Sequence, residues 1–218
     1  MKYHGRLLIA CAMWMCALAG RAEADLIAAT YPIPADPVSG FSCGAGMGTD
    51  GGEVFDNRKA QSFTTLEGGT LSTVSFVASR LPGTDVDLRL NVMTFDAGQP
   101  DEMLATTLIG IESFYEGFLP GWPEDFTHEV DFSDAGVVLE QDRMYALVFL
   151  TDTTEANYRL YGDYGGYDGG QLLSSQNGSP YKPHDSDLFF EVRVLIPAPG
   201  SIVLLVIGVI RPGRRRSP

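Results

Sequence analysis

The fold is decided by the stretch DVDLRLNVMT, residues 85–94, which has an apolar residue at every second position: Val86, Leu88, Leu90 and Val92. This alternation is typical of a β-strand with one face in a core. Eight further stretches alternate in the same way or are rich in β-branched residues: AQSFTT (60–65), TLSTVSFVAS (70–79), MLATTLIGI (103–111), FTHEVDF (126–132), GVVLE (136–140), RMYALVFL (143–150), ANYRLYG (156–162) and DLFFEVRVL (187–195). No segment keeps a helical apolar period over ten or more residues. The pattern predicts an all-β fold, a single antiparallel β-sandwich over residues 59–195.

The first 24 residues have the order of a secretory signal peptide, with a basic start, the apolar run 7–18 and small residues at Ala22 and Ala24 before Asp25. The apolar run is about half of the ~20 residues that a permanent membrane helix needs. We therefore predict a signal helix that is cleaved during export.

Residues 25–58 are rich in proline, glycine and alanine, as in YPIPADPVSG (31–40) and FSCGAGMGTDGG (41–52). Successive prolines and glycines favour irregular chain. This predicts an extended arm with at most one short strand. Cys43 lies in the arm and is the single cysteine after the signal, so no internal disulfide is expected.

The last 23 residues, 196–218, have three parts: Pro197, Ala198, Pro199 and Gly200, then the apolar run 202–210, then a basic cluster with Arg214, Arg215 and Arg216. The apolar run predicts a short helix, and the arginines are expected to stay on the cytoplasmic side of a membrane. The tail resembles the PEP-CTERM sorting signal of Gram-negative-type bacteria, although Ala198 replaces the glutamate of that motif. The resemblance implies processing by an exosortase, a transient contact of the tail with the membrane, and an association with exopolysaccharide or biofilm.

A second resemblance covers roughly residues 60–195. The domain opens with Gln61-Ser62-Phe63, continues through the strand 86–92 and the turn Gly98-Gln99-Pro100, and ends on the strand 145–148. This order is similar to the jelly-roll domains of secreted bacterial proteins, which share their plan with carbohydrate-binding modules. The resemblance implies a jelly-roll-like sandwich and leaves the function open.

The charge balance argues against nucleic-acid binding. Residues 25–195 carry 27 acidic and 8 basic side chains, a net charge of −19. Phosphate recognition needs a basic face. The composition instead favours a soluble acidic domain that can gather divalent cations.

Aromatic residues supply the candidate glycan-binding side chains. Tyr161, Tyr164 and Tyr167 recur every three residues along a strand end and loop, and Trp122 lies in the long 112–125 connection. Exposed aromatic clusters mark binding surfaces. In a sandwich, however, alternate aromatics also form the core, so packing is the competing interpretation.

Calcium is the one cofactor that the sequence suggests. The loop DYGGYDGG (163–170) presents Asp163 and Asp168 among glycines, and hard cations prefer carboxylate and carbonyl oxygens. The loop does not match EF-hand spacing, so a solvated acidic turn is the alternative. Asn177-Gly178 is expected to form a type I′ hairpin turn.

Catalytic motifs are weak. Gly40-Phe41-Ser42-Cys43-Gly44 fits G-x-S-x-G by letter, but the sequence places no strand before it and no helix after it. His128 and His184 belong to no zinc-binding motif. We therefore expect a non-enzymatic, exported protein of the cell surface or extracellular matrix, with a carbohydrate-binding, lectin-like module as the alternative.

Overall fold

The computed structural model describes residues 23–32, 40–50, 53–117, 126–152, 157–164 and 166–197, and the side chains of 25–32, 56–117, 126–152, 157–164 and 166–196. The strands are β1 (Glu23–Tyr31), β2 (Gly40–Asp50), β3 (Glu53–Thr64), β4 (Gly69–Arg80), β5 (Leu88–Asp96), β6 (Gln99–Ile109), β7 (Thr127–Asp131), β8 (Val138–Leu139), β9 (Met144–Leu150), β10 (Asn157–Asp163), β11 (Leu172–Gln176), β12 (Lys182–Pro183), β13 (Asp187–Leu188) and β14 (Phe190–Pro197). Two 3-10 turns, Ile111–Ser113 and Ser133–Ala135, complete the regular structure of these residues.

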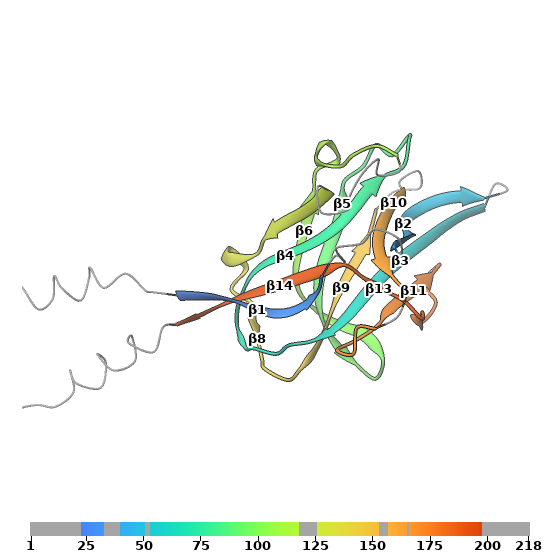
Figure 1. The fold of residues 1–218 in the computed structure, drawn as a ribbon. Coiled ribbons are helices and arrows are strands. Elements are labelled where there is room, and N and C mark those ends of the chain that lie inside the picture. Colours follow the sequence, from blue (N-terminus) through green and yellow to red (C-terminus); the bar gives the residue numbers. More distant parts are fainter. Residues whose placement is uncertain are drawn as a thin grey trace, which may run out of the picture. The chain divides into compact units, whose positions relative to one another are not determined.

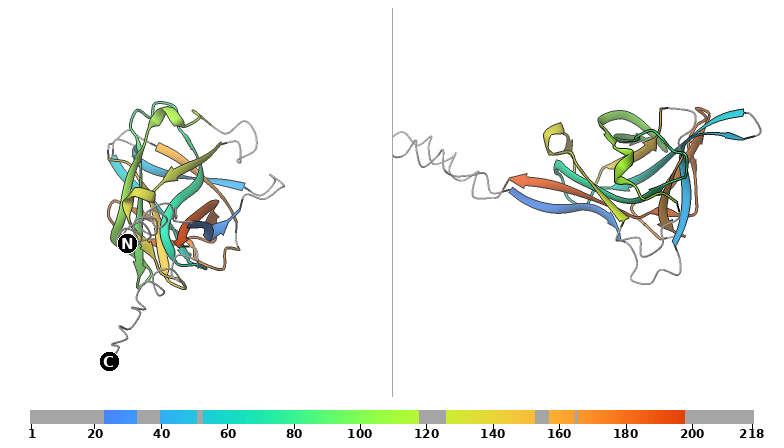
Figure 2. Two further views of the ribbon diagram at one scale, coloured as in Figure 1. Left: turned by 90° about the vertical axis from the view of Figure 1, so that its left-hand side faces the viewer. Right: turned by 90° about the horizontal axis from the view of Figure 1, so that it is seen from above.

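The strands form two antiparallel sheets that share β4 (Figure 1). In the first sheet β4 has β14, β7 and β8 as neighbours, and β1 pairs with the other side of β14. In the second sheet the order is β10-β2-β3-β9-β5-β6, while β11 pairs with β3 and β13 with β10. Figure 2 shows both sheets from two further sides. This arrangement confirms the predicted all-β, sandwich-like fold.

Strand β4 passes from one sheet to the other. It pairs with β8 and β7 up to Val77, and its last three residues, Ala78–Arg80, pair with β10. From Ser72 to Phe76 its side chains alternate between buried and half-buried, whereas Phe76–Ser79 are all buried. The continuous burial follows from the crossing, because a strand between two layers is covered on both faces.

One hydrophobic core fills the space between the sheets. Its fully buried large side chains come from both: Phe63, Leu71, Phe76, Leu88, Leu90, Leu139, Leu147, Phe149, Tyr158, Leu160 and Leu172. A smaller cluster of Ala60, Ala146, Val148 and Leu173 lies on the opposite face of β3 and β9. Strand β9 is therefore buried on both faces, which explains why Tyr145–Phe149 is a continuous apolar run.

The prediction of an arm over residues 25–58 is wrong for the described part of that segment. Strands β1, β2 and the first half of β3 occupy it, and the larger of the chain's two compact units runs from Leu26 to Val194. Strand β2 contains four glycines, which weaken strand propensity. Pairing with β10 along one edge and with β3 along the other overrides that propensity.

The hairpin turn at Asn177-Gly178 is confirmed. Both residues have positive φ, 53° and 72°, as a type I′ turn requires, and the Ser179 amide donates to the Gln176 carbonyl oxygen at 3.0 Å. The turn predicted at Gly98-Gln99-Pro100 lies slightly earlier, at Ala97-Gly98, where φ is 48° and 80°, and Gln99 and Pro100 already belong to β6.

Among the residues that the structure describes, no helix has the length and apolar character needed to span a bilayer. The predicted helices of residues 1–24 and 202–210 fall outside the described residues except for Glu23 and Ala24, which begin β1.

We predict that Leu90→Ala destabilises the fold by roughly 2–5 kcal/mol, because it leaves a cavity at a fully buried site. The free energy of unfolding in urea measures the effect. The matched control is Leu108→Ala on the neighbouring strand β6, where the leucine is 54% exposed and the change is expected within about 0.5 kcal/mol. Equal losses for the two variants would contradict the assignment of the core.

Candidate functional site

The predicted tyrosines differ in their exposure and in their contacts. The Tyr161 hydroxyl lies 3.1 Å from the Ser79 hydroxyl oxygen on β4. Tyr164 is 73% exposed. Tyr167 packs edge-on against Phe190, with ring centroids 5.2 Å apart, and burial raises its pKa to about 12. The three side chains thus have different surroundings, and Trp122 lies outside the described residues.

The two predicted calcium ligands also differ in their settings. Asp163 ends β10, and its Oδ1 accepts a hydrogen bond from the Tyr164 amide at 2.7 Å. Asp168 is exposed in a turn. Within the described ranges no group of three or more His, Cys, Asp or Glu side chains is placed to hold a metal ion. Calcium binding stays a prediction.

The tyrosine-rich segment, which we define as the chain from Tyr161 to Gln171, contacts β3 at its C-terminal end. The Gln171 amide donates to the Ser62 hydroxyl at 2.9 Å, and the Ser62 amide donates to the Gln171 carbonyl oxygen at 3.0 Å. A Cβ on Gly170 would lie 2.0 Å from the Ser62 carbonyl oxygen. Gly170 is therefore required for this close approach of two backbones.

The buried carboxylate of Asp187 also binds the tyrosine-rich segment. Asp187, only 5% exposed, accepts hydrogen bonds from Gln61 Nε2 at 2.9 Å and from the Tyr167 amide at 3.2 Å. Gln61 is fully buried, and its Oε1 accepts from the Leu188 amide at 2.8 Å. Desolvation raises the pKa of Asp187, while its hydrogen bonds act in the opposite direction. This network fixes β13 and the tyrosine-rich segment to β3.

A crevice of about 240 Å³ is lined by residues of β1, β4, β7 and β14 and of the chain next to them. It is lined by Thr30, Tyr31, Pro32, Ser75, Phe76, Val77, Thr127, Phe189, Phe190 and Glu191. The residues of β4 that line it lie immediately before the part of β4 that pairs with β10. The crevice is thus beside the crossing between the sheets.

Tyr31 connects this crevice to the predicted site residues. Its ring stacks on Phe189 with centroids 5.9 Å apart and an interplanar angle of 29°, and lies 6.0 Å from the Tyr167 ring. Burial raises the pKa of Tyr31, and the negative charges of Asp163 and Asp187 raise it further. Tyr31 therefore lines the crevice and also contacts the ring of Tyr167, one of the predicted site residues.

Tyr31 and Phe189 were not predicted as site residues. Tyr31 belongs to the segment interpreted as an arm, and Phe189 to a strand interpreted as core. One signal was available for Tyr31: the apolar stretch LIAATY at 26–31 ends directly before Pro32, as a strand before a turn does.

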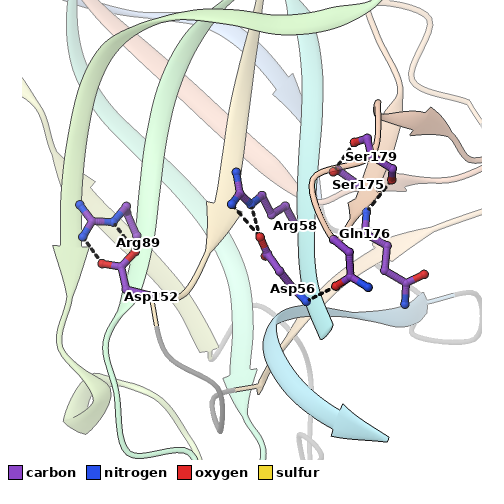
Figure 3. Close-up of polar contacts among 8 residues, drawn as sticks. Asp56, Arg58, Arg89, Asp152, Ser175, Gln176 and Ser179 are labelled. Atoms are coloured by element: carbon purple, nitrogen blue, oxygen red, sulfur yellow. Dashed lines mark hydrogen bonds and ion pairs between the residues drawn. The ribbon is translucent and has the colours of Figure 1, made fainter. Parts of the chain in front are cut away.

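Arginines at the surface of the described unit are paired with carboxylates. Figure 3 shows Arg58 with Asp56, 2.6 Å apart, and Arg89 with Asp152. Further pairs join Arg80 to Glu116, Arg143 to Glu140 and Arg193 to Glu191. Pairing of these cations leaves the excess of acidic groups to set the sign of the surface potential.

Asp187→Asn is expected to change how stability depends on pH. The folded chain raises the pKa of Asp187, so this carboxyl binds its proton more tightly in the folded state than in the unfolded state. Its contribution to stability is therefore full at acidic pH and is lost as pH rises above the ordinary value of 3.8 through the folded pKa.

Urea unfolding of both proteins from pH 3.5 to 7 measures this effect. Wild type should lose stability relative to the variant as pH rises through that window. Asp168→Asn, at an exposed carboxylate of the same segment, is the matched control and should follow wild type. A constant difference between wild type and Asp187→Asn across the range would refute the assignment.

Most of the residues predicted to act in sorting and export lie outside the described part of the chain. Pro197 is the last residue of β14, and Ala24 and Asp25 lie near the start of β1, whereas Ala22, Ala198, Pro199, Gly200 and Arg214–Arg216 are not described. No protein-family model matches the chain, and a search of curated proteins finds no significant match.

Proposed function

We propose that this chain is a non-enzymatic protein exported to the cell surface or extracellular matrix of a Gram-negative-type bacterium. In this proposal an exosortase-type membrane protease recognises the C-terminal tail, and the mature domain associates with exopolysaccharide or biofilm. The observation that carries the proposal is the order of the tail: Pro197 to Gly200, the apolar run 202–210, and the arginine cluster 214–216.

The point in the sequence at which the tail begins supports this proposal. Strand β14 ends at Pro197, and the compact unit ends at Val194. A cleavage within or after residues 197–200 would remove the apolar run and the arginines without removing a residue of that unit. The folded domain would then be released or transferred intact.

The rigidity and the negative charge of the domain also suit a protein of the extracellular matrix. A sandwich with one large core is a rigid unit, and a net charge of −19 over residues 25–195 keeps it soluble among polysaccharides. The jelly-roll plan suggested by the turn motifs is part of the proposal. A sandwich does not by itself determine function, so the tail remains the decisive feature.

Export from the producing bacterium should yield a mature protein that lacks both ends. The expected mass corresponds to a start near Asp25 and an end near the Pro197–Gly200 motif, measured by intact mass spectrometry of the surface and secreted fractions. Replacing Arg214, Arg215 and Arg216 together with alanine should abolish the C-terminal cut.

The triple replacement Arg58→Ala, Arg89→Ala, Arg143→Ala is the control, since it removes the same charge from the folded domain. A mature wild-type species that still ends at Pro218 would refute processing at this tail.

The crevice beside Tyr31 favours a second candidate function, carbohydrate binding by a lectin-like module. The half-buried Tyr31 belongs to its lining, and so do the hydroxyl-bearing residues Thr30, Ser75 and Thr127. Sugar recognition uses such a combination, because sugar rings have apolar C–H faces and polar edges. The exposed Tyr164 and the loop 163–170 offer a different, calcium-dependent surface.

Binding of the exported protein to the exopolysaccharide of its own host separates these alternatives. Saturable binding that a chelator abolishes, and that Tyr164→Ala weakens, would favour the loop 163–170. Saturable binding that the chelator leaves unchanged, and that Tyr31→Ala weakens at least tenfold, would favour the crevice. Absence of binding in both conditions would leave a structural matrix protein.

A further inference from the structure

We infer that Ser174 is a nucleophile that accepts one acyl group from an ester, with His184 as its general base. This inference goes beyond the proposed matrix function and depends neither on the tail nor on the crevice beside Tyr31. It assigns a covalent modification site to the folded domain.

The Ser174 hydroxyl and the His184 imidazole are in direct contact. Ser174 Oγ lies 2.6 Å from His184 Nε2, and the hydroxyl donates to Nε2 when the ring carries its proton on Nδ1. A hydroxyl that donates to a neutral imidazole is the arrangement in which histidine removes the proton as serine attacks a carbonyl carbon. The pair thus has the geometry of a nucleophile and its base.

Backbone pairing holds the two side chains in this arrangement. Strand β11 pairs with β3 on one side (Figure 1) and with β12 on the other. Ser174 lies opposite Lys59 of β3 and opposite Lys182 of β12. The His184 amide, two residues after Lys182, donates to the Leu172 carbonyl oxygen at 2.9 Å. Opposite residues of antiparallel strands share a face, so His184 is a diagonal neighbour of Ser174.

Two lysines are the cross-strand neighbours of Ser174. Lys59 and Lys182 are the two lysines of residues 25–195, a segment with a net charge of −19. Lys59 is only 8% exposed, whereas Lys182 is exposed. The carbonyl oxygen of an ester becomes negative as serine attacks, and nearby cations stabilise this charge. The two lysines therefore provide positive charge beside the nucleophile, within an otherwise acidic domain.

The surroundings of His184 favour its neutral form. Burial and the positive charge of Lys59 lower the pKa of His184 below its ordinary value of 6.5, whereas the carboxylate of Asp185 acts in the opposite direction. Lys182, two residues earlier on the same face of β12, is a further cation. A neutral imidazole can accept a proton, so the base is in its active form at pH 7.

The acyl transfer uses only the serine, the histidine and the ester. Ser174 Oγ forms a bond to the acyl carbon as its proton passes to His184 Nε2. The C–O bond of the ester then breaks, and the imidazolium returns the proton to the departing alcohol. The products are an acyl ester of Ser174 and a free alcohol, and His184 is neutral again.

The exposure of the pair indicates which esters can reach it. Ser174 is half-buried and His184 is exposed, so both lie at the surface of the domain. An ester carried on a polymer can approach such a position without entering a cavity. The class of acyl donor is therefore a surface-accessible ester, small or attached to a polymer.

The test is incubation of the exported protein with p-nitrophenyl acetate, followed by measurement of nitrophenolate release and by peptide mass spectrometry. One acetyl group per chain is expected on Ser174, and Ser174→Ala should abolish it. His184→Gln should slow the acetylation roughly a hundredfold, because a general base contributes at least that much. Ser133→Ala, which removes another serine hydroxyl at the surface, is the matched control and should leave the rate unchanged.

The pH dependence of the acetylation reports on the base itself. The rate in wild type should reach half its maximum below pH 6.5. Lys59→Met removes the buried charge and should raise this midpoint. Lys182→Met, at an exposed position, keeps the inference testable if Lys59→Met disturbs folding, and it should slow the acetylation roughly tenfold. A histidine that only braces the hairpin would move neither the midpoint nor the rate.

Absence of acetylation would overturn the inference, and so would an acetyl group on Lys59 or Lys182 in place of Ser174 or a rate that does not depend on His184. Each of these outcomes leaves the sorting proposal in place, because that proposal is tested by the mass of the mature protein. Release of several nitrophenolates per chain, with Ser174 as the acetylated residue, would support the nucleophile and refute the non-enzymatic part of the proposed function.

Discussion

Strand β4 must exchange its hydrogen-bonding neighbours partway along its length, and the other elements are arranged around that exchange. Its first residues complete one sheet with β7 and β8, and its last three residues continue the other through β10. The chain crosses back at Phe189, between β13 on β10 and β14 beside β4. Two crossings so close together leave a gap that side chains do not fill completely, and the crevice lined by Tyr31 is that gap.

Elements with one buried face, or with a continuous apolar run, could be predicted from the sequence. Strand β5 shows the alternation of a half-buried strand, and β9 shows the run of a strand buried on both faces. Strand β2 could not be predicted, because it contains four glycines and its extended form depends on β10, more than 100 residues later in the chain. Strand β11 was not predicted either, because LLSSQ is short and lacks a clear alternation, and it is held as a strand by pairing with β3, which lies more than 100 residues earlier.

Some members of the candidate site, such as Tyr167, could be predicted from the sequence, but Tyr31, Phe189 and the arrangement of the site could not. Spacing along the chain suggested that Tyr161, Tyr164 and Tyr167 act together, yet β10 ends at Asp163 and the following segment turns back onto β3. The position of Tyr167 is set by Asp187, and the position of Tyr31 by Phe189, over sequence separations of 20 and more than 150 residues. Contacts of this kind depend on tertiary packing, which local spacing does not encode.

The place of β14 in its sheet has a mechanical consequence for a protein held at its C-terminus. Strand β14 has β1 on one side and β4 on the other, and its last residue is the first of the proposed sorting motif. Interstrand hydrogen bonds run across the strand direction, so tension applied at Pro197 loads the bonds on both sides of β14 together instead of opening them one after another. A domain tethered through this strand would resist shear flow as a unit, with the tether joined to a central strand of the sheet.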